Sequence, residues 1–208
     1  AMDLRYADAH TNAILQAWYP GAEGGTAVAD VLFGRVSPSG KLPVTFYKDT
    51  SDLPEFTDYS MKNRTYRYME KEALYPFGYG LTYSDTCVTE AEVVGEVSAE
   101  SDIVLKATVK NNGTVDTDEV VQVYIKDLDS PLAVRNYSLC GFKRVSLKAG
   151  EEKSVEFTIS NKAMNIVDED GNRYIAGKHF RLFAGVSQPD TRSAELTGHK
   201  PAEVEIAL

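Results

Sequence analysis

The residue types best suited to catalysis or metal binding are three histidines and two cysteines: His10, His179, His199, Cys87 and Cys140. A catalytic histidine needs a positioned nucleophile, and none of the three stands in a known motif with serine or cysteine. No two of these residues have metal-ligand spacing, so a zinc site is not expected. We expect ordinary surface or half-buried histidines. We also expect two free thiols in a reducing compartment, with a disulfide as the alternative.

Several acidic side chains could bind a ligand, but each has a structural interpretation. Glu23, in PGAEGG, precedes a predicted helix, where a negative charge is favourable against the helix dipole; a sugar contact is the alternative. Asp168, Glu169 and Asp170 precede Gly171 and could hold calcium, but the later ligands of an EF-hand loop are missing. We interpret this run as a hairpin turn. A second acidic group is interpreted as a solvated loop: Asp116, Asp118 and Glu119.

The segment NRTYRY, residues 63–68, interleaves two arginines with tyrosines. Arg64 and Arg67 can pair with acids on a partner domain or stack on the tyrosine rings. We expect adhesion between domains here rather than substrate binding. Three asparagines fit the N-glycosylation pattern, which matters only in a secreted eukaryotic chain: Asn63, Asn112 and Asn136.

The composition limits the classes of partner. The 208 residues carry a formal net charge of −9, which argues against nucleic acid, because its binding needs a basic surface. The charge gives no support for an anionic membrane either, whereas a neutral partner such as a sugar is permitted. No cofactor is expected. No signal peptide is visible, so we expect a cytoplasmic protein, although Ala1 before Met2 is typical of a cloning remnant and leaves the natural start open.

Residues 1–46 have the pattern of an α/β domain. The apolar run Ala13–Tyr19 is consistent with a buried strand. EGGTAVADVLFG, residues 23–34, has apolar side chains at helical spacing and ends in a glycine, where a helix C-cap would lie. The turn SPSG then leads into the extended segment KLPVTF, residues 41–46. One strand–helix–strand piece cannot cover both faces of a parallel sheet, so this segment looks like the end of a larger domain.

Periodicity is lost between residues 47 and 85 and changes character beyond them. LYPFGYGLTYS, residues 74–84, is too apolar for a solvated linker and too rich in glycine and proline for a helix. From residue 86 onward, short alternating runs such as Ile103–Val109 and Val121–Ile125 are separated by turn signals, which describes an antiparallel immunoglobulin-like β-sandwich. The turn signals are Asn111-Asn112-Gly113, Ala149-Gly150 and Asp170-Gly171. The fold class is therefore mainly β, and a true immunoglobulin domain is disfavoured because Trp18 lies outside this half.

Several blocks in a fixed order closely resemble the family-3 glycoside hydrolases. They are AWYPGAEGGTAVADVLFGRVSPSGKLPVTFY, then NRTYRY, then LYPFGYGLTYS. LCGFKRVSLKAGEEKSVEFTIS and DEDGNRYIAGKHFRLFAGVS resemble the fibronectin type III-like domain attached to many of them. On that template, residues 1–46 are the terminal part of an α/β sandwich domain, 47–85 a connector and 86–208 the fibronectin-like domain. We then expect four connector aromatics to serve packing between domains, with a sugar-stacking platform as the alternative: Tyr75, Phe77, Tyr79 and Tyr83.

The resemblance implies a retaining, exo-acting β-glucosidase or β-xylosidase, in which one carboxylate attacks and a second group acts as acid/base. The family's nucleophile lies in a barrel motif that this chain lacks, and the glutamate acid/base lies upstream of Ala13. No catalytic, substrate-binding or metal residue is assigned, and the fragment alone is expected to be inactive. Its expected partners are the remaining barrel and α/β domains, and a β-glycoside substrate for the complete enzyme. The position of the barrel and the choice of glucoside or xyloside stay open.

Two other functions are weighed against this one. An independent carbohydrate-binding module would expose aromatics on one sandwich face, but several of the candidates fall at inward positions. These candidates are Tyr124, Tyr137, Phe142, Tyr174, Phe180 and Phe183. A protein-interaction domain would use an exposed apolar patch. Residues 1–85, without the rest of their domain, are expected to create such a patch and to self-associate or repack onto the sandwich.

Overall fold

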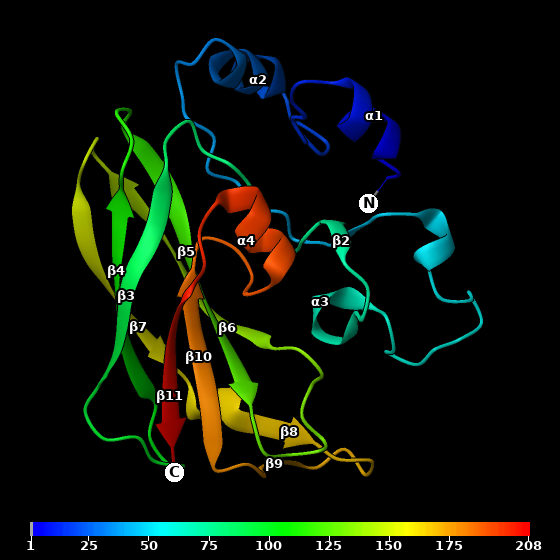
Figure 1. The fold of residues 1–208 in the computed structure, drawn as a ribbon, viewed down its shortest axis with the longest axis vertical. Helices are drawn as coiled ribbons and strands as arrows, with labels where there is room; N and C mark the ends of the chain where they lie inside the picture. Colours follow the sequence, from blue (N-terminus) through cyan, green and yellow to red (C-terminus); the bar gives the residue numbers. More distant parts are fainter. Residues whose placement is uncertain (1) are drawn as a thin grey trace.

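The computed structural model describes residues 2–208, and two antiparallel sheets packed face to face dominate it (Figure 1). The four-stranded sheet has the order β11-β10-β5-β6 and the three-stranded sheet the order β3-β4-β7. The bounds of the first sheet are β5 Thr117–Asp127, β6 Ser138–Leu147, β10 His179–Gly185 and β11 Ala202–Ala207. Those of the second are β3 Thr86–Val94, β4 Ile103–Asn111 and β7 Glu152–Ile159. The predicted mainly-β sandwich is confirmed.

The core follows from the alternation along the central strands. On β4, Leu105, Ala107 and Val109 are completely buried and face the inward residues of β5, among them Val121 and Val123. Burying a leucine or valine side chain stabilises a fold by about 1.5–3 kcal/mol. The two strands therefore hold the sheets together, as their alternating sequences predict.

The predicted turns lie where the strands end. Gly150, between β6 and β7, has a φ of 71°, which favours glycine. Asp168 heads the hairpin between β8 (Asn165–Val167) and β9 (Arg173–Ile175), and its carboxylate accepts the backbone N–H groups of Asp170 and Asn172 at 3.0 and 2.8 Å. These hydrogen bonds, above all those from Asn172, lower the pKa of Asp168. The hairpin interpretation of this acidic run is confirmed.

The N-terminal segment agrees with its prediction only in part. Helix α2 (Gly24–Leu32) forms as expected, and Gly34 follows it in the left-handed region at φ 70°. The predicted strand Ala13–Tyr19 is wrong: the segment is irregular and largely exposed. A strand needs a hydrogen-bonded neighbour, and among residues 2–208 no strand pairs with this segment.

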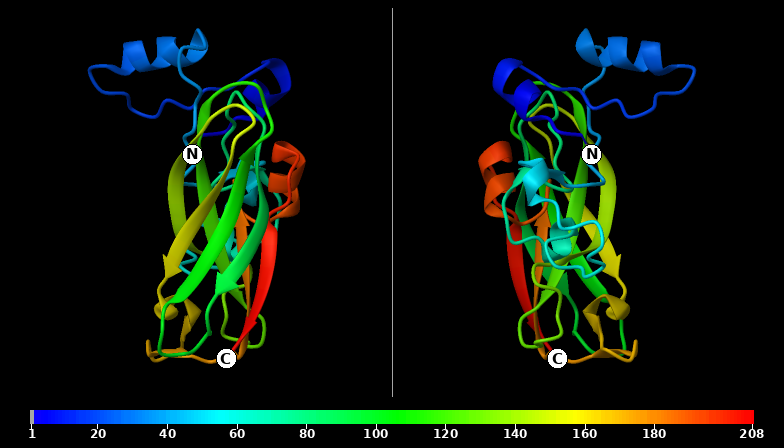
Figure 2. Two further views of the ribbon diagram at one scale, coloured as in Figure 1. Left: turned by 90° about the vertical axis from the view of Figure 1, so that its left-hand side faces the viewer. Right: turned by 90° about the vertical axis from the view of Figure 1, so that its right-hand side faces the viewer.

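The expected parallel strand–helix–strand unit is also absent from the described residues. Strand β1 (Phe46–Tyr47) pairs antiparallel with β2 (Ala73–Tyr75) from the connector. Helices α1 (Arg5–His10) and α2 both lie toward the end of the sandwich opposite the C-terminus (Figure 1), and Figure 2 shows them on different sides of it. Helix α2 buries only Gly24 completely: Val28 and Val31 are half-buried, and Leu32 at its end is exposed.

Short helices complete the chain, and the sequence pattern did not predict them. They are η1 Thr50–Asp52, α3 Thr65–Tyr68, η2 Asn161–Met164 and α4 Thr191–Thr197. Three to seven residues are too few for a helical period to show. Within residues 2–208, no helix is long and apolar enough to cross a membrane.

Replacing Leu105 by alanine should lower the free energy of unfolding by about 2–5 kcal/mol, because the cavity lies in a fully buried layer. Urea unfolding followed by circular dichroism measures this. Leu128→Ala, at a 39% exposed position after β5, is the control and should cost about 0.5 kcal/mol or less. Equal losses for the two variants would contradict the assignment of the core.

Candidate functional site at the connector–sandwich interface

Glu119 is a carboxylate buried at one end of the sandwich core. It lies on β5, on the same face as Val121, and is 1% exposed. Its Oε1 lies 2.7 Å from the ammonium of Lys41. Its Oε2 accepts the hydroxyl of Thr86 at 2.6 Å. The interpretation of Glu119 as part of a solvated loop is wrong, because its partner comes from a segment far away in the chain.

Lys41 joins three parts of the molecule at this point. Its ammonium pairs with Glu119 of β5 and also donates to the carbonyl of Gly80 in the connector at 2.7 Å. Both side chains of the ion pair are more than nine-tenths buried. Burial removes the hydration of both ions, so each charge depends on the other and on these hydrogen bonds.

Backbone contacts surround this ion pair. The N–H of Leu42 donates to the carbonyl of Tyr79 at 2.9 Å, and that of Gly78 to the carbonyl of Leu42 at 2.8 Å. A Cβ atom on Gly80 would collide with the carbonyl of Gly40, and one on Gly78 with the side chain of Gln122. Gly78 also has a φ of 77°. The connector glycines therefore permit close backbone approach, as the sequence predicts.

Gln122 fixes the connector to the outward face of the same strand. Its amide donates to the carbonyls of Gly78 and Val186 at 2.9 and 3.1 Å. Its Oε1 accepts the hydroxyl of Tyr124 at 2.6 Å. Because Glu119 faces inward and Gln122 outward, β5 holds the preceding segments from both of its faces.

An aromatic cluster extends this contact, made of Tyr66, Phe77, Tyr124, Tyr137 and Phe183. The rings of Tyr66 and Phe77 stack with centroids 4.3 Å apart, and Tyr66 meets Tyr124 edge-on at 6.0 Å. The motifs NRTYRY and LYPFGYG thus pack on each other and on the sheet. The predicted packing role of Phe77 is confirmed.

The other connector tyrosines contact the N-terminal segment. Tyr75 stacks on Tyr79 with centroids 5.8 Å apart and donates its hydroxyl to Asp8 at 2.5 Å. Burial and this hydrogen bond raise the pKa of Tyr75 to about 12. Tyr83 donates to the carbonyl of Val31 in α2 at 2.6 Å. These side chains therefore link both N-terminal helices to the connector.

Asn136, the asparagine of one predicted N-glycosylation pattern, has a structural role. Its side-chain amide donates to the carbonyls of Tyr66 and Met69 at 2.8 and 3.0 Å, holding α3 against the sheet. The guanidinium of Arg67 lies 5.8 Å from the ring of Tyr68, as the stacking interpretation expects. Arg64 donates to the carbonyl of Ser60 at 3.0 Å and to other carbonyls of its own loop.

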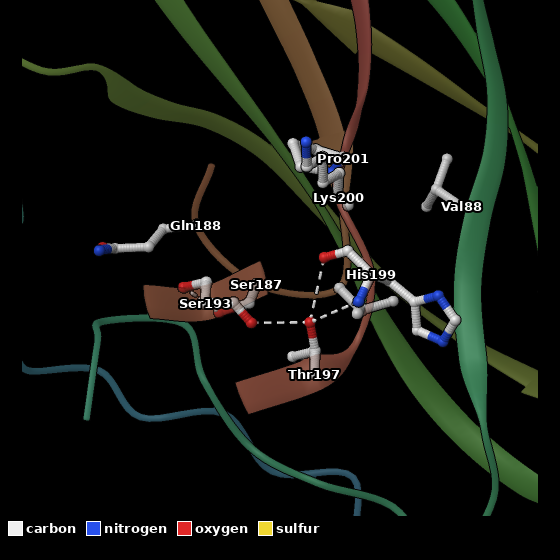
Figure 3. A pocket seen from close by; sticks show the side chains of 10 residues that line it. Val88, Ser187, Gln188, Ser193, Thr197, His199, Lys200 and Pro201 are labelled. Atoms are coloured by element: carbon white, nitrogen blue, oxygen red, sulfur yellow. Dashed lines mark hydrogen bonds between the residues drawn. The ribbon is translucent and has the colours of Figure 1, made fainter. Parts of the chain in front are cut away.

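The residue types of a serine–histidine–aspartate site do occur together beside α4, in a hollow of about 10 Å³ (Figure 3). The hydroxyl of Ser187 donates to that of Ser193 at 3.0 Å. The imidazole of His199 points away from both serines in Figure 3 and pairs with Asp85 at 2.5 Å. The hollow has room for a single water at most, so this group is a hydrogen-bonded packing feature.

The remaining predicted residues are separate from one another. His10 stacks on Tyr6, and His179 pairs with Asp129 at 3.0 Å. Glu23 occupies the N-cap position of α2, as expected. Within residues 2–208, no three His, Cys, Asp or Glu side chains are grouped to hold a metal ion.

Both cysteines are free thiols, on β3 and β6. Burial raises the pKa of Cys140 to about 12, which disfavours the reactive thiolate.

Of the six sandwich aromatics considered for carbohydrate binding, four are buried: Tyr124, Tyr137, Phe180 and Phe183. The two exposed ones, Phe142 and Tyr174, lie on separate sheets. The sandwich therefore presents no aromatic platform within the described residues.

Two family models match the chain. The model described as the glycosyl hydrolase family 3 C-terminal domain matches residues 1–83. The model described as a fibronectin type III-like domain matches residues 119–188.

Individual proteins agree with these matches. A xylan 1,4-beta-xylosidase from Xylanibacter ruminicola is 44% identical over 189 residues, covering 89% of this chain and 21% of that protein. A putative beta-xylosidase from Formosa agariphila is 36% identical over 184 residues, covering 86% and 24%. The crystal structure of a beta-glucosidase from Kluyveromyces marxianus superposes with a TM-score of 0.82 at 28% identity, covering 99% of this chain and 25% of that one.

The fold and these matches define a β-sandwich domain preceded by a segment that matches the glycosyl hydrolase family 3 C-terminal domain. The chain belongs to the C-terminal part of the glycosyl hydrolase family 3 proteins and includes their fibronectin type III-like domain. The resemblance found in the sequence is confirmed. The chain spans only about a fifth to a quarter of the length of the relatives named here.

Replacing Lys41 by methionine should lower the free energy of unfolding by about 3–5 kcal/mol, because Glu119 is left buried without its partner. Lys106→Met, which breaks the exposed pair with Glu92, is the matched control and should cost about 1 kcal/mol or less. The double variant Lys41→Met/Glu119→Gln should recover part of the loss. Equal losses for Lys41→Met and Lys106→Met in urea unfolding would contradict this role.

Stability should fall at alkaline pH. Burial raises the pKa values of Tyr124 and Tyr137 in the folded chain, while an unfolded tyrosine has a pKa of about 10. The stabilisation is complete below pH ~10 and declines above it, because the unfolded chain releases protons that the folded chain keeps. Cys140 acts in the same direction from about pH 9.

Urea midpoints measured from neutral to alkaline pH test this decline. Tyr137→Phe should flatten it, whereas Tyr19→Phe, at a fully exposed position, should leave it unchanged. A midpoint independent of pH up to about pH 11 would contradict the buried tyrosines.

Proposed function

We propose that this chain is the structural C-terminal part of a retaining β-glycosidase that removes terminal β-D-xylosyl or β-D-glucosyl residues. The observation that carries the proposal is the interface on β5, where Glu119 and Gln122 bind segments that match the family 3 C-terminal domain. In this role the sandwich holds the end of the α/β domain and the connector in place through the Lys41–Glu119 ion pair and the hydrogen bonds of Gln122. The relatives named as xylosidases and a glucosidase support the substrate class.

The uncovered surface of α2 supports the same role. Leu32 and Phe33 are exposed at its end, and Tyr19 just before it is fully exposed. Exposed large apolar side chains such as these are typical of a surface that another domain covers. We infer that the remaining α/β and barrel domains cover it in the complete enzyme. The self-association expected of the isolated chain stays a prediction.

Catalysis then depends on carboxylates outside these residues. A retaining glycosidase needs two carboxyl groups about 5–5.5 Å apart, one as nucleophile and one as acid/base. The carboxylates of the described interface are engaged otherwise: Glu119 pairs with Lys41, and Asp8 accepts the hydroxyl of Tyr75. We therefore propose that this part of the enzyme supports the active site without entering the reaction.

Hydrolysis of p-nitrophenyl β-D-xyloside and β-D-glucoside tests the proposal. The 208-residue chain should show no turnover, and the same chain within its complete protein should be active. In the complete protein, Lys41→Met should shorten the half-life of activity on heating and leave kcat/KM at low temperature nearly unchanged, with Lys106→Met as the control. Turnover by the short chain, or an inactive complete protein, would overturn the proposal.

A further inference from the structure

One side of the sandwich is formed by the edge strands of both sheets. Strand β6 is the last strand of the four-stranded sheet, and β7 is the last strand of the three-stranded sheet. The two strands also contact each other across the gap between the sheets. A strand with a neighbour on one side presents unpaired backbone N–H and C=O groups, to which a strand of another chain can bind. The β6–β7 side is therefore an open edge of the sandwich.

The register of β7 shows which of its backbone groups are unpaired. The N–H of Asn111 donates to the carbonyl of Glu151 at 2.9 Å, so these opposite residues form a hydrogen-bonded pair. Opposite residues of an antiparallel pair alternate between hydrogen-bonded and non-hydrogen-bonded positions. Glu156, opposite Lys106, lies an odd number of residues further along the ladder. Its N–H and C=O therefore point away from β4, toward the open edge.

Each edge strand carries a lysine at an inward-facing position. Lys143 of β6 lies opposite Val121, and Lys153 of β7 lies opposite Val109. Both valines are completely buried in the core. Directly opposite residues of a sheet have their side chains on the same face, so both lysines lie on the core side of their strands. Inward-pointing charges on edge strands are one of the devices that prevent sheets from pairing edge to edge.

Both ammonium groups reach across the gap to the other sheet. That of Lys143 donates to the carbonyl of Glu156 on β7 at 2.5 Å. That of Lys153 donates to the carbonyl of Ser146 on β6 at 2.6 Å. The ammonium of Lys143 also lies 5.6 Å from the ring centroid of Phe157. Each lysine therefore occupies a backbone acceptor on the edge strand of the opposite sheet.

An incoming strand would have to displace or bury these ammonium groups. A strand added to β7 needs the carbonyl of Glu156 as an acceptor, and Lys143 already donates to it. The partners of the Lys143 ammonium are a carbonyl and an aromatic ring, so covering the edge would remove its water without supplying a counter-ion. Lys153 pairs with Glu151 of its own chain at 3.1 Å. Strand addition is therefore most unfavourable at Lys143.

We propose that Lys143 and Lys153 keep the β6–β7 side closed, and that the strand they exclude is β7 of a second copy of this chain. An antiparallel β7–β7 contact is two-fold symmetric, so the same outward backbone groups would serve both copies. The segment SVEFTI, residues 154–159, combines β-branched and aromatic residues with a single charge, which is typical of a strand that pairs readily. This role does not depend on the proposed glycosidase.

Sedimentation velocity of the 208-residue chain over a range of concentrations tests this role. The variant Lys143→Met/Lys153→Met should dimerise at least about tenfold more tightly than the parent chain, because methionine keeps an apolar stem and removes the donor and the charge. The variant Lys143→Arg/Lys153→Arg keeps both and should associate as the parent chain does. The matched control is Lys106→Met/Lys110→Met, which makes the same change on β4, a strand with neighbours on both sides.

Hydrogen exchange of the Glu156 amide locates the contact. At dimerising concentration this amide should be more protected in the methionine variant than in the parent chain, because a second β7 would bind it. Association through the exposed segment before residue 37 is common to all four chains and cancels in the comparison. The urea midpoint of the methionine variant should stay close to that of the parent chain, since both lysines lie at an edge that water reaches.

Four results would overturn the proposal. The methionine variant could associate no more tightly than the control on β4, or the arginine variant could associate as tightly as the methionine variant. Association could leave the Glu156 amide unprotected, which would place the contact elsewhere. Loss of the fold in the methionine variant would make the two lysines a requirement of the core rather than a barrier to pairing.

Discussion

The buried ion pair between Lys41 and Glu119 is the constraint on which the arrangement of this chain depends. A carboxylate at the end of a β-sandwich core is unfavourable unless a cation reaches it, and here the cation comes from the segment before β1. Once Lys41 is bound, the backbone of residues 40–42 lies against residues 78–80 and leaves no room for side chains on Gly78 and Gly80. The ion pair and these backbone contacts therefore define the geometry of the junction, and the aromatic cluster adds buried apolar surface to it.

The chain consists of one part whose polar and apolar groups are paired within the chain and one part whose apolar side chains stay exposed. The sandwich and the connector satisfy each other through Gln122, Asn136 and the stacked rings of Tyr66 and Phe77. The segment before residue 37 contains helices whose apolar side chains stay exposed. An interface that ends in exposed apolar side chains is the structure expected from the role proposed above. The family 3 C-terminal model matches residues 1–83 and therefore includes both the exposed segment and most of the connector.

Much of the fold could be predicted from the sequence because local patterns determine it. The alternation from Ile103 to Val109 gave β4 and its buried face, and the glycine after residues 168–170 gave a hairpin. The strand expected at Ala13–Tyr19 failed because pairing in a sheet depends on neighbours that a local pattern does not contain. The interface between the connector and the sandwich could be predicted from the sequence only in part. Aromatics and glycines indicated packing, but an acidic residue followed by valines gave no sign that Glu119 is buried opposite a lysine.

Hydrogen exchange of the native chain tests the central claim most directly, that the connector and the sandwich open as one unit. The amide of Asn136 donates to the carbonyl of Arg67 and so joins the connector to the loop before β6; that of Gly78 joins the connector to Leu42 beside the ion pair, and that of Leu105 lies in the core. The account predicts that all three exchange with the same free energy of opening, equal to that of global unfolding. Exchange of Asn136 and Gly78 at much lower free energy, while Leu105 stays protected, would contradict it and make the connector a loosely attached segment.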